Sequence, residues 1–275
     1  MENIYISDLD HTLLRSDHTI SDFTKDIWHK VAQNSLISIA TARSYQSVIT
    51  FLKDIEFKTP LIVLDGSMII SPNDKIITTN SLSNDTTQSI IEVGLKFGIS
   101  PFIIGLKDSN QKEVFLYPKV MNANQQFVFN GYRDDPRTEY NPKNKSTKTT
   151  MKLSYFGELE VLEPFANELK RVFKESLEIK LSPENYTSGY FLTVLNPKSD
   201  KSNALKYLLD YLELSNPYLS VFGDSLNDIG MFKLSNKSIA VSNALDEVKS
   251  VADIVLPYSN DEDGVAKYLS QLKYD

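Results

Sequence analysis

Several features are scarce or absent in this chain, and each absence narrows the choice of function. Among the 275 residues there is no cysteine, which excludes disulfides and thiol catalysis. Lys and Arg number 29 against 36 Asp and Glu, a net charge of -7, so we expect no nucleic-acid binding, which needs clustered cations. No apolar run approaches the ~20 residues that cross a membrane, and the N-terminus lacks a basic-then-apolar export signal. We therefore expect a cytoplasmic protein that binds no membrane.

The remaining composition is that of an ordinary globular protein. Hydrophobic residues make up 41% of the chain and charged residues 24%. A length of 275 residues is enough for one large or two modest domains with a real hydrophobic core. An acidic chain can still act on small anions, provided that a local cation offsets the repulsion.

Both ends of the chain alternate short apolar strands with amphipathic helices. Ser21 and Ser44 are placed to cap two of these helices, and Asp200 or Ser202 a third. Strand-like runs occupy 4–7, 36–40, 61–64, 219–222, 239–241 and 254–256. Such a βαβ order predicts an α/β fold with a doubly wound, Rossmann-like parallel sheet.

The middle of the chain has a different pattern, in which strands follow one another without intervening helices. Helices are predicted at 85–97, 124–129 and 159–173, and strands at 102–104, 114–116, 151–155, 177–181 and 191–195. This pattern predicts an α+β domain, 83–192, inserted into a core formed by 1–82 and 193–275. We interpret the polar segment 141–150 as a solvated loop rather than a substrate-contacting patch.

Carboxylates follow two of the predicted parallel strands. Asp8 and Asp10 come after the first strand, and Asp224 and Asp228 come after the strand at 219–222. Ligands in open α/β sheets gather at the carboxyl ends of the strands, so these side chains should converge. Four carboxylates cannot all stay charged without a hard cation, and Mg²⁺ prefers oxygen ligands and phosphate oxygens.

The spacing of the first two carboxylates suits phosphoryl transfer. Asp8, at a strand end, can attack phosphorus and form an aspartyl-phosphate, while Asp10 can protonate the leaving oxygen and then activate water. Thr41 can donate a hydroxyl to a phosphate oxygen, and Lys201 can supply a point charge. Taken singly, each of these residues has a structural alternative: a turn, a helix cap or an exposed lysine. Their joint placement at one edge of one sheet is what favours the chemical interpretation.

These residues carry a family resemblance that covers nearly the whole chain. Four segments resemble the four motifs of the haloacid dehalogenase superfamily, in its Cof-type branch with a large α/β cap. In chain order they are DLDHTLL, ATAR, SDKSNAL and GDSLND. The resemblance implies Asp8 as nucleophile and metal ligand, and Asp10 as general acid/base with a metal-binding carbonyl. It also implies Thr41 and Lys201 on the phosphate.

In the fourth motif, the resemblance implies Asp224 as a metal ligand. Asn227 would then support the phosphate, and Asp228 the water bound to the metal. The inserted domain falls between the second and third motifs, where this branch carries its cap.

Three positions depart from the family pattern. His11 stands where glycine is usual, and we interpret it as a turn residue rather than a second catalytic acid. Ala42 replaces the glycine of the second motif. Asp65 replaces asparagine before Gly66 and could repel a phosphate or contact a sugar hydroxyl, so Asp65 and Arg43 are candidates for substrate contact.

The sequence therefore predicts a Mg²⁺-dependent phosphatase that acts on a small phosphorylated metabolite such as a sugar phosphate. A phosphomutase on the same scaffold is one alternative, and it would return the phosphate to its substrate. A non-catalytic metal-dependent binding or regulatory module is another, although the intact pair Asp8 and Asp10 favours an enzyme.

Overall fold

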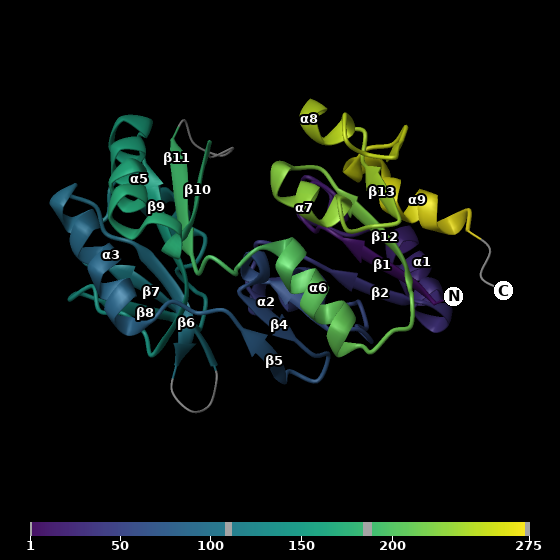
Figure 1. The fold of residues 1–275 in the computed structure, drawn as a ribbon, viewed down its shortest axis with the longest axis horizontal. Helices are drawn as coiled ribbons and strands as arrows, with labels where there is room; N and C mark the ends of the chain where they lie inside the picture. The colour runs from purple at the N-terminus through teal and green to yellow at the C-terminus, as the bar shows by residue number, and fades with distance from the viewer. Residues whose placement is uncertain (1, 108–111, 184–188, 273–275) are drawn as a thin grey trace. The chain divides into compact units, whose positions relative to one another are not determined.

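The chain folds as two compact units. A computed structural model describes residues 2–107, 112–183 and 189–272 (Figure 1). One unit, here called the core unit, consists of Met1–Thr78 with Asp200–Asp275, and the other, the inserted unit, consists of Thr79–Ser199. Among the described residues, no helix is both long and apolar enough to cross a membrane.

A five-stranded sheet organises the core unit, and all its neighbouring strands are parallel. In spatial order its strands are β14 (Ile254–Val255), β13 (Lys237–Ala240), β12 (Tyr218–Gly223), β1 (Asn3–Ser7) and β2 (Leu36–Ile39). Figure 1 shows the purple β1 beside the yellow-green β12, so two segments more than 200 positions apart in the sequence pair in the middle of one sheet. This arrangement confirms the predicted doubly wound parallel sheet.

Three of the described helices of the core unit begin after a predicted capping side chain. Ser21, Ser44 and Asp200 each accept a backbone N–H of the first turn that follows. The helices are α1 (Asp22–Asn34), α2 (Tyr45–Phe51), α6 (Lys201–Tyr211), α7 (Ile229–Phe232), α8 (Asp246–Lys249) and α9 (Gly264–Ser270), with 3₁₀ turns η1 (Leu64–Gly66), η3 (Leu226–Asp228) and η4 (Asn260–Glu262).

The third predicted strand differs from expectation, because it does not extend the main sheet. β3 (Leu61–Val63) touches that sheet through one bridge, Ala40 to Ile62, and belongs to a separate sheet with β4 (Met68–Ile70) and β5 (Ile76–Thr79). Three successive residues in the left-handed region, Leu64 to Gly66, turn the chain back so that β4 pairs antiparallel to β3. A Cβ on Gly66, at φ +87°, would lie 2.5 Å from the Asp200 carbonyl oxygen, so this turn needs glycine.

In its described residues, 79–107, 112–183 and 189–199, the inserted unit contains a six-stranded mixed sheet and three helices. The strands, in spatial order, are β10 (Glu178–Pro183), β11 (Tyr190–Leu195), β9 (Thr149–Gly157), β6 (Phe102–Lys107), β7 (Lys112–Pro118) and β8 (Thr138–Asn141). All neighbours are antiparallel except β7 and β8. The helices are α3 (Asn84–Lys96), α4 (Ala123–Asn130) and α5 (Leu159–Phe173), with a 3₁₀ turn η2 (Lys174–Ser176). An inserted α+β fold is thus confirmed.

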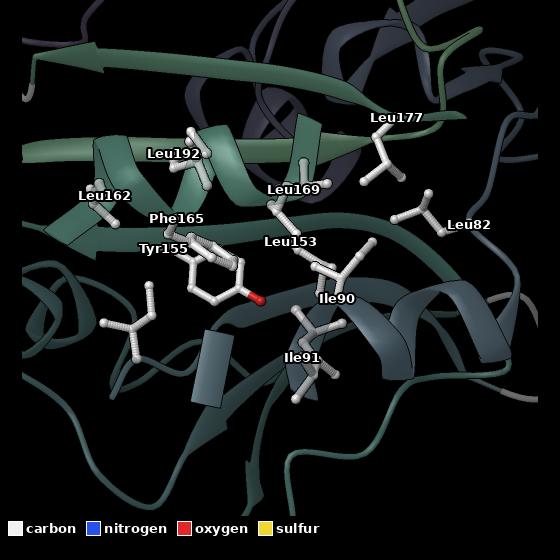
Figure 2. Close-up of a cluster of buried hydrophobic side chains, with 14 residues drawn as sticks. Leu82, Ile90, Ile91, Leu153, Tyr155, Leu162, Phe165, Leu169, Leu177 and Leu192 are labelled. Atoms are coloured by element: carbon white, nitrogen blue, oxygen red, sulfur yellow. The ribbon is translucent and has the colours of Figure 1, made fainter. Parts of the chain in front are cut away.

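A buried apolar cluster lies between α3, α5 and one face of this sheet. Figure 2 shows the ring of Tyr155 among Leu153, Phe165 and Ile90, within this apolar cluster. Within the described part of the chain that hydroxyl has no hydrogen-bond partner, and burial raises the pKa of Tyr155. A polar atom in this environment costs stability.

The prediction of a solvated loop at 141–150 is only partly right. Lys143, Lys145 and Lys148 are exposed, but Thr150 is fully buried in β9 and Thr147 is nearly so. The two hydroxyls lie 2.9 Å apart, in hydrogen-bond contact, which lets polar side chains enter the interior.

Candidate active site

Asp8 stands at the carboxyl end of the central strand β1. Its backbone N–H continues the β1–β12 pairing by donating to the Phe222 carbonyl at 3.0 Å. Only 5% of the residue is exposed. Burial raises the pKa of Asp8 well above its ordinary value; Lys201 opposes the shift, and the neighbouring carboxylates of Asp228 and Asp224 add to it. The fold has therefore placed this carboxylate where it needs positive charge.

Lys201 supplies part of that charge from the first turn of α6. Its Nζ lies 2.5 Å from Asp8 Oδ1 and 2.8 Å from Asp228 Oδ1, and the residue is 1% exposed. Burial disfavours the ammonium, but the two carboxylates outweigh that effect and raise the pKa of Lys201. Lys201 is therefore a buried cation between two anions, and not the exposed lysine that its position in a first helical turn suggests by itself.

Asp228, which is fully buried, ties the fourth motif to Lys201. Its Oδ2 accepts the backbone N–H groups of Asp224 and Ser225, both at 3.1 Å, while Oδ1 accepts Lys201. A Cβ on Gly223 would lie 2.6 Å from the Asp228 Cβ, so the close approach requires glycine there. One oxygen of Asp228 thus holds the loop after β12, and the other binds Lys201.

Asp224 completes the acidic cluster. One carboxylate oxygen from each of Asp8, Asp224 and Asp228 lies within 4.8 Å of the others. Burial, followed by repulsion from Asp228, raises the pKa of Asp224 to about 6. Three carboxylates face one ammonium, and the raised pKa values of Asp8 and Asp224 mean that the cluster holds too much negative charge by itself. The donor set therefore fits a hard divalent cation, which takes oxygen ligands.

Asp10 lies two residues after Asp8, in the turn that follows β1, but its side chain has a different partner from that of Asp8. The Arg43 Nε lies 2.8 Å from both Asp10 oxygens, and Nη2 lies 2.6 Å from Oδ1. The Asp10 side chain is 31% exposed and the Arg43 side chain 20%, so the pair is partly open to solvent. Of the two residues named as candidates for substrate contact, Arg43 is thus in direct contact with Asp10.

Thr41 and Asp65 meet through the backbone. Thr41 is fully buried, and its Oγ1 accepts the Arg43 N–H at 3.1 Å, which leaves its own proton available to donate. Asp65 is 4% exposed, adopts φ 55° and donates its N–H to the Thr41 carbonyl at 3.0 Å. What the structure shows for Asp65 is a backbone contribution to the placement of the second motif.

Asn227 and His11 lie at the edges of the site. Asn227 accepts the Ser225 hydroxyl at 2.8 Å through Oδ1, so its amide NH₂ is the group that can face an anion. His11 adopts φ 56°, and its carbonyl accepts Asn243 Nδ2 at 2.8 Å. His11 therefore acts as a turn residue, as its replacement of glycine indicates.

Two contributions were missed from the sequence. Thr12 donates its hydroxyl to Asp224 Oδ1 at 2.8 Å, which fixes a carboxylate that lies 212 positions away. Phe51, the last residue of α2, lies beneath the Arg43 guanidinium, 4.3 Å from its carbon to the ring centre. Thr12 carries a hydroxyl only two positions after Asp10, and this short distance in sequence was a signal that could have identified it. No local pattern links Phe51 to the site.

Comparison with known proteins places this geometry in a family. The haloacid dehalogenase-like hydrolase family matches residues 5–269. Two proteins of Bacillus subtilis named 5-amino-6-(5-phospho-D-ribitylamino)uracil phosphatase are similar over nearly their whole length. YwtE is 26% identical (96% of each chain), and YitU is 23% identical (96% of this chain and 95% of YitU). The crystal structure of TM0651 from Thermotoga maritima has a TM-score of 0.81 at 24% identity, covering 100% of this chain and 99% of that one.

The fold, the order of the four motifs along the chain and the family match over almost every residue agree with one another. The protein belongs to the haloacid dehalogenase-like hydrolases.

Proposed function

We propose that this hydrolase is a Mg²⁺-dependent phosphatase that cleaves a small phosphorylated metabolite through an aspartyl-phosphate on Asp8. The main support is that Asp8, Lys201 and the carboxylates of Asp224 and Asp228 converge within hydrogen-bonding and metal-ligand distances. The names of its relatives, which are phosphatases, support the same reaction class.

Asp8 and Asp224 would hold the metal, together with the backbone carbonyl of Asp10 that the family resemblance implies. Asp228 is less available, because its two oxygens already accept Lys201 and two backbone N–H groups. When bound, Mg²⁺ supplies positive charge that lets an anionic phosphate approach an anionic nucleophile. Lys201 contributes a second, permanent positive charge on the same carboxylate.

In the first step, a carboxylate oxygen of Asp8 attacks phosphorus and the bond from phosphorus to the ester oxygen breaks. Asp10 gives its proton to that departing oxygen, so the product leaves as a neutral alcohol. Lys201 contacts the Asp8 carboxyl at 2.5 Å and would fix its rotation, and the Thr41 hydroxyl and the Asn227 amide would donate to phosphate oxygens.

In the second step, Asp10, now a carboxylate, takes a proton from water, and that water attacks phosphorus. The bond from phosphorus to the Asp8 oxygen breaks, which releases inorganic phosphate and restores the carboxylate. Arg43 contacts the Asp10 carboxyl through Nε and Nη2 and therefore lies beside the proposed base. A mutase would retain the phosphate at this stage, so phosphate release separates the two reactions.

The inserted unit would act as the cap that selects the leaving group. Among substrates, sugar phosphates and polyol phosphates come first, because two relatives are named for a phosphorylated ribitylamino compound. A small molecule with one phosphate ester and several hydroxyls is the substrate class that we propose.

The test is phosphate release over a panel of such esters, with and without Mg²⁺, for the parent protein and Asp8→Asn. The variant should lose turnover by more than ~10³-fold while keeping the parent's circular dichroism spectrum, because it removes the nucleophile and little volume. Asp246→Asn, at an exposed carboxylate on α8, is the matched control and should keep parent activity. Turnover by Asp8→Asn near the parent rate would contradict the proposed nucleophile.

A further inference from the structure

The contact between Arg43 and Asp10 has the geometry of a clamp. Two guanidinium nitrogens, Nε and Nη2, bind one carboxylate, with three N···O distances from 2.6 to 2.8 Å. Side-on pairing of this kind fixes the rotation of the carboxyl group as well as its position. Asp10 lies in a turn, not in a strand, so this pairing restricts a side chain that the backbone alone leaves free to rotate.

The guanidinium is in turn held by an aromatic ring. The Arg43 Cζ lies 4.3 Å above the centre of the Phe51 ring, the distance of a cation–π contact. Phe51 ends α2, and the same helix buries Val48 against the core unit, so the ring stands on a rigid support.

The loop that faces Phe51 is also anchored. The His18 ring packs against Phe51 with centroids 5.5 Å apart. Arg15 begins this loop and pairs with Asp263 at 2.8 Å, while its backbone N–H donates to the Thr19 carbonyl. These contacts limit the space into which the Phe51 ring, and with it Arg43, can move.

We propose that Phe51 and Arg43 are positioning residues for Asp10, forming an aromatic–guanidinium–carboxylate stack that sets the direction in which Asp10 transfers protons. The inference rests on the proposed general acid/base role of Asp10. It differs from the sequence-based hypothesis that Arg43 contacts substrate, since the guanidinium edge formed by Nε and Nη2 is directed at Asp10.

Two kinetic signatures follow from this arrangement. General acid–base catalysis contributes about 10²–10⁴-fold, and a misdirected carboxyl loses part of it. Esters with poor leaving groups need the proton most. Loss of the stack should therefore slow alkyl phosphates much more than nitrophenyl phosphate, and it should lower kcat rather than raise KM.

A double-mutant cycle tests Arg43. In the parent background, Arg43→Ala should lower kcat for an alkyl phosphate by about 10–100-fold, and in an Asp10→Asn background by less than ~3-fold, because the group that it positions is already gone. An equal loss in both backgrounds, or a rise in KM alone, would show that Arg43 acts on the substrate and would overturn the proposal.

A second series tests Phe51, which touches neither substrate nor Asp10 in this assignment. Phe51→Leu should reproduce the leaving-group dependence of Arg43→Ala at smaller amplitude, about 3–10-fold, whereas Phe51→Tyr keeps the ring and should retain parent kinetics. Phe23→Leu, at an exposed site on α1, controls for the general effect of losing a phenyl ring. If Phe51→Leu and Phe51→Tyr behave alike, the ring has no positioning role.

A readout independent of turnover separates this inference from the proposed function. Crystal structures of the parent, Phe51→Leu and Phe51→Tyr should show Asp10 in one rotamer when the ring is present and in several when it is absent. A single unchanged Asp10 rotamer in Phe51→Leu overturns the stack even if the enzyme is active. Failure of the parent protein to release phosphate from any ester overturns the proposed function, whatever the rotamers show.

Discussion

Replacement of Lys201 by methionine removes the positive member of a buried three-residue group. Methionine keeps the length and most of the volume of the side chain, so the loss is that of charge, not of packing. Asp8 and Asp228, whose side chains are 7% and 0% exposed, would face each other across the site without their shared cation. Breaking a buried ion pair by removing one partner costs about 3–5 kcal/mol. At about 2–4 °C for each kcal/mol, the melting temperature should fall by about 6–20 °C.

The chain offers a specific probe for this measurement. Its one tryptophan, Trp28, is buried on α1 of the core unit, the same unit that contains Lys201. Urea unfolding followed by Trp28 fluorescence therefore reports the affected unit. Lys206→Met, one turn further along α6 at an exposed position, is the matched control and should change the free energy of unfolding by less than ~0.5 kcal/mol.

The sign of the pH dependence makes the test sharper. Burial already raises the pKa of Asp8, and removal of Lys201 takes away the charge that opposes this shift. The folded variant then binds a proton that the unfolded chain releases, so its stability falls as pH rises through the raised pKa. We expect the loss relative to the parent to be smaller at pH 5 than at pH 8, and to shrink again when Mg²⁺ is added. A loss below ~1 kcal/mol at pH 8 without metal would refute the assignment of Lys201 as the cation that holds the two carboxylates.

Three further predictions concern the metal site and the packing. Burial raises the pKa of Asp224 to about 6, so Mg²⁺ must displace a proton below that pH. Titration calorimetry should show that the affinity for Mg²⁺ falls from pH 7 to pH 5, and an affinity that stays constant over this range would contradict the prediction. Gly223→Ala places a Cβ 2.6 Å from that of Asp228 and should cost about 1–3 kcal/mol and weaken Mg²⁺ binding, unlike Gly131→Ala, whose Cβ meets nothing closer than 3.4 Å. Tyr155→Phe removes a hydroxyl without a partner in the described chain and should raise the free energy of unfolding by about 1 kcal/mol. Urea unfolding followed by circular dichroism measures this free energy, and a decrease of about 1 kcal/mol would contradict the prediction.

Local signals in the sequence predicted the five strands of the main sheet and the helices α1, α2 and α6, but not β4, β5, α7 or α8. Ser21, Ser44 and Asp200 cap their helices because a short oxygen-bearing side chain before an amphipathic run satisfies the free N–H groups of the first turn. The spacing of apolar residues was less reliable for predicting which face of a helix is buried. On α1, the four-residue spacing of Phe23, Ile27 and Val31 favours a single buried face, yet Phe23 is 42% exposed, whereas Trp28 and Val31 are buried. Neighbouring elements decide which stripe of a helix is covered.

The small sheet of β3, β4 and β5 shows a second limit of local patterns. The apolar run at 61–64 was correctly interpreted as a strand, but it joins the main sheet through only one parallel bridge and pairs along its length with β4. The direction of the chain after β3 depends on the left-handed turn at Leu64 to Gly66, and two of those residues are not glycine. Such conformations are uncommon for leucine, so the sequence carries little sign of them.

The sequence by itself determined the chemistry that is available: paired aspartates after an apolar strand, a threonine, a lysine and a second acidic loop, each at the carboxyl end of a parallel strand or the start of a helix. Only the tertiary structure decided which of these groups share charge. Lys201 bridges Asp8 and Asp228, whereas Asp10, two residues from Asp8, pairs with Arg43 above the Phe51 ring. Partnerships of this kind join residues tens to hundreds of positions apart. They depend on burial, because a lower local dielectric strengthens the interaction between charges. Burial is a property of the packed fold and not of any short segment.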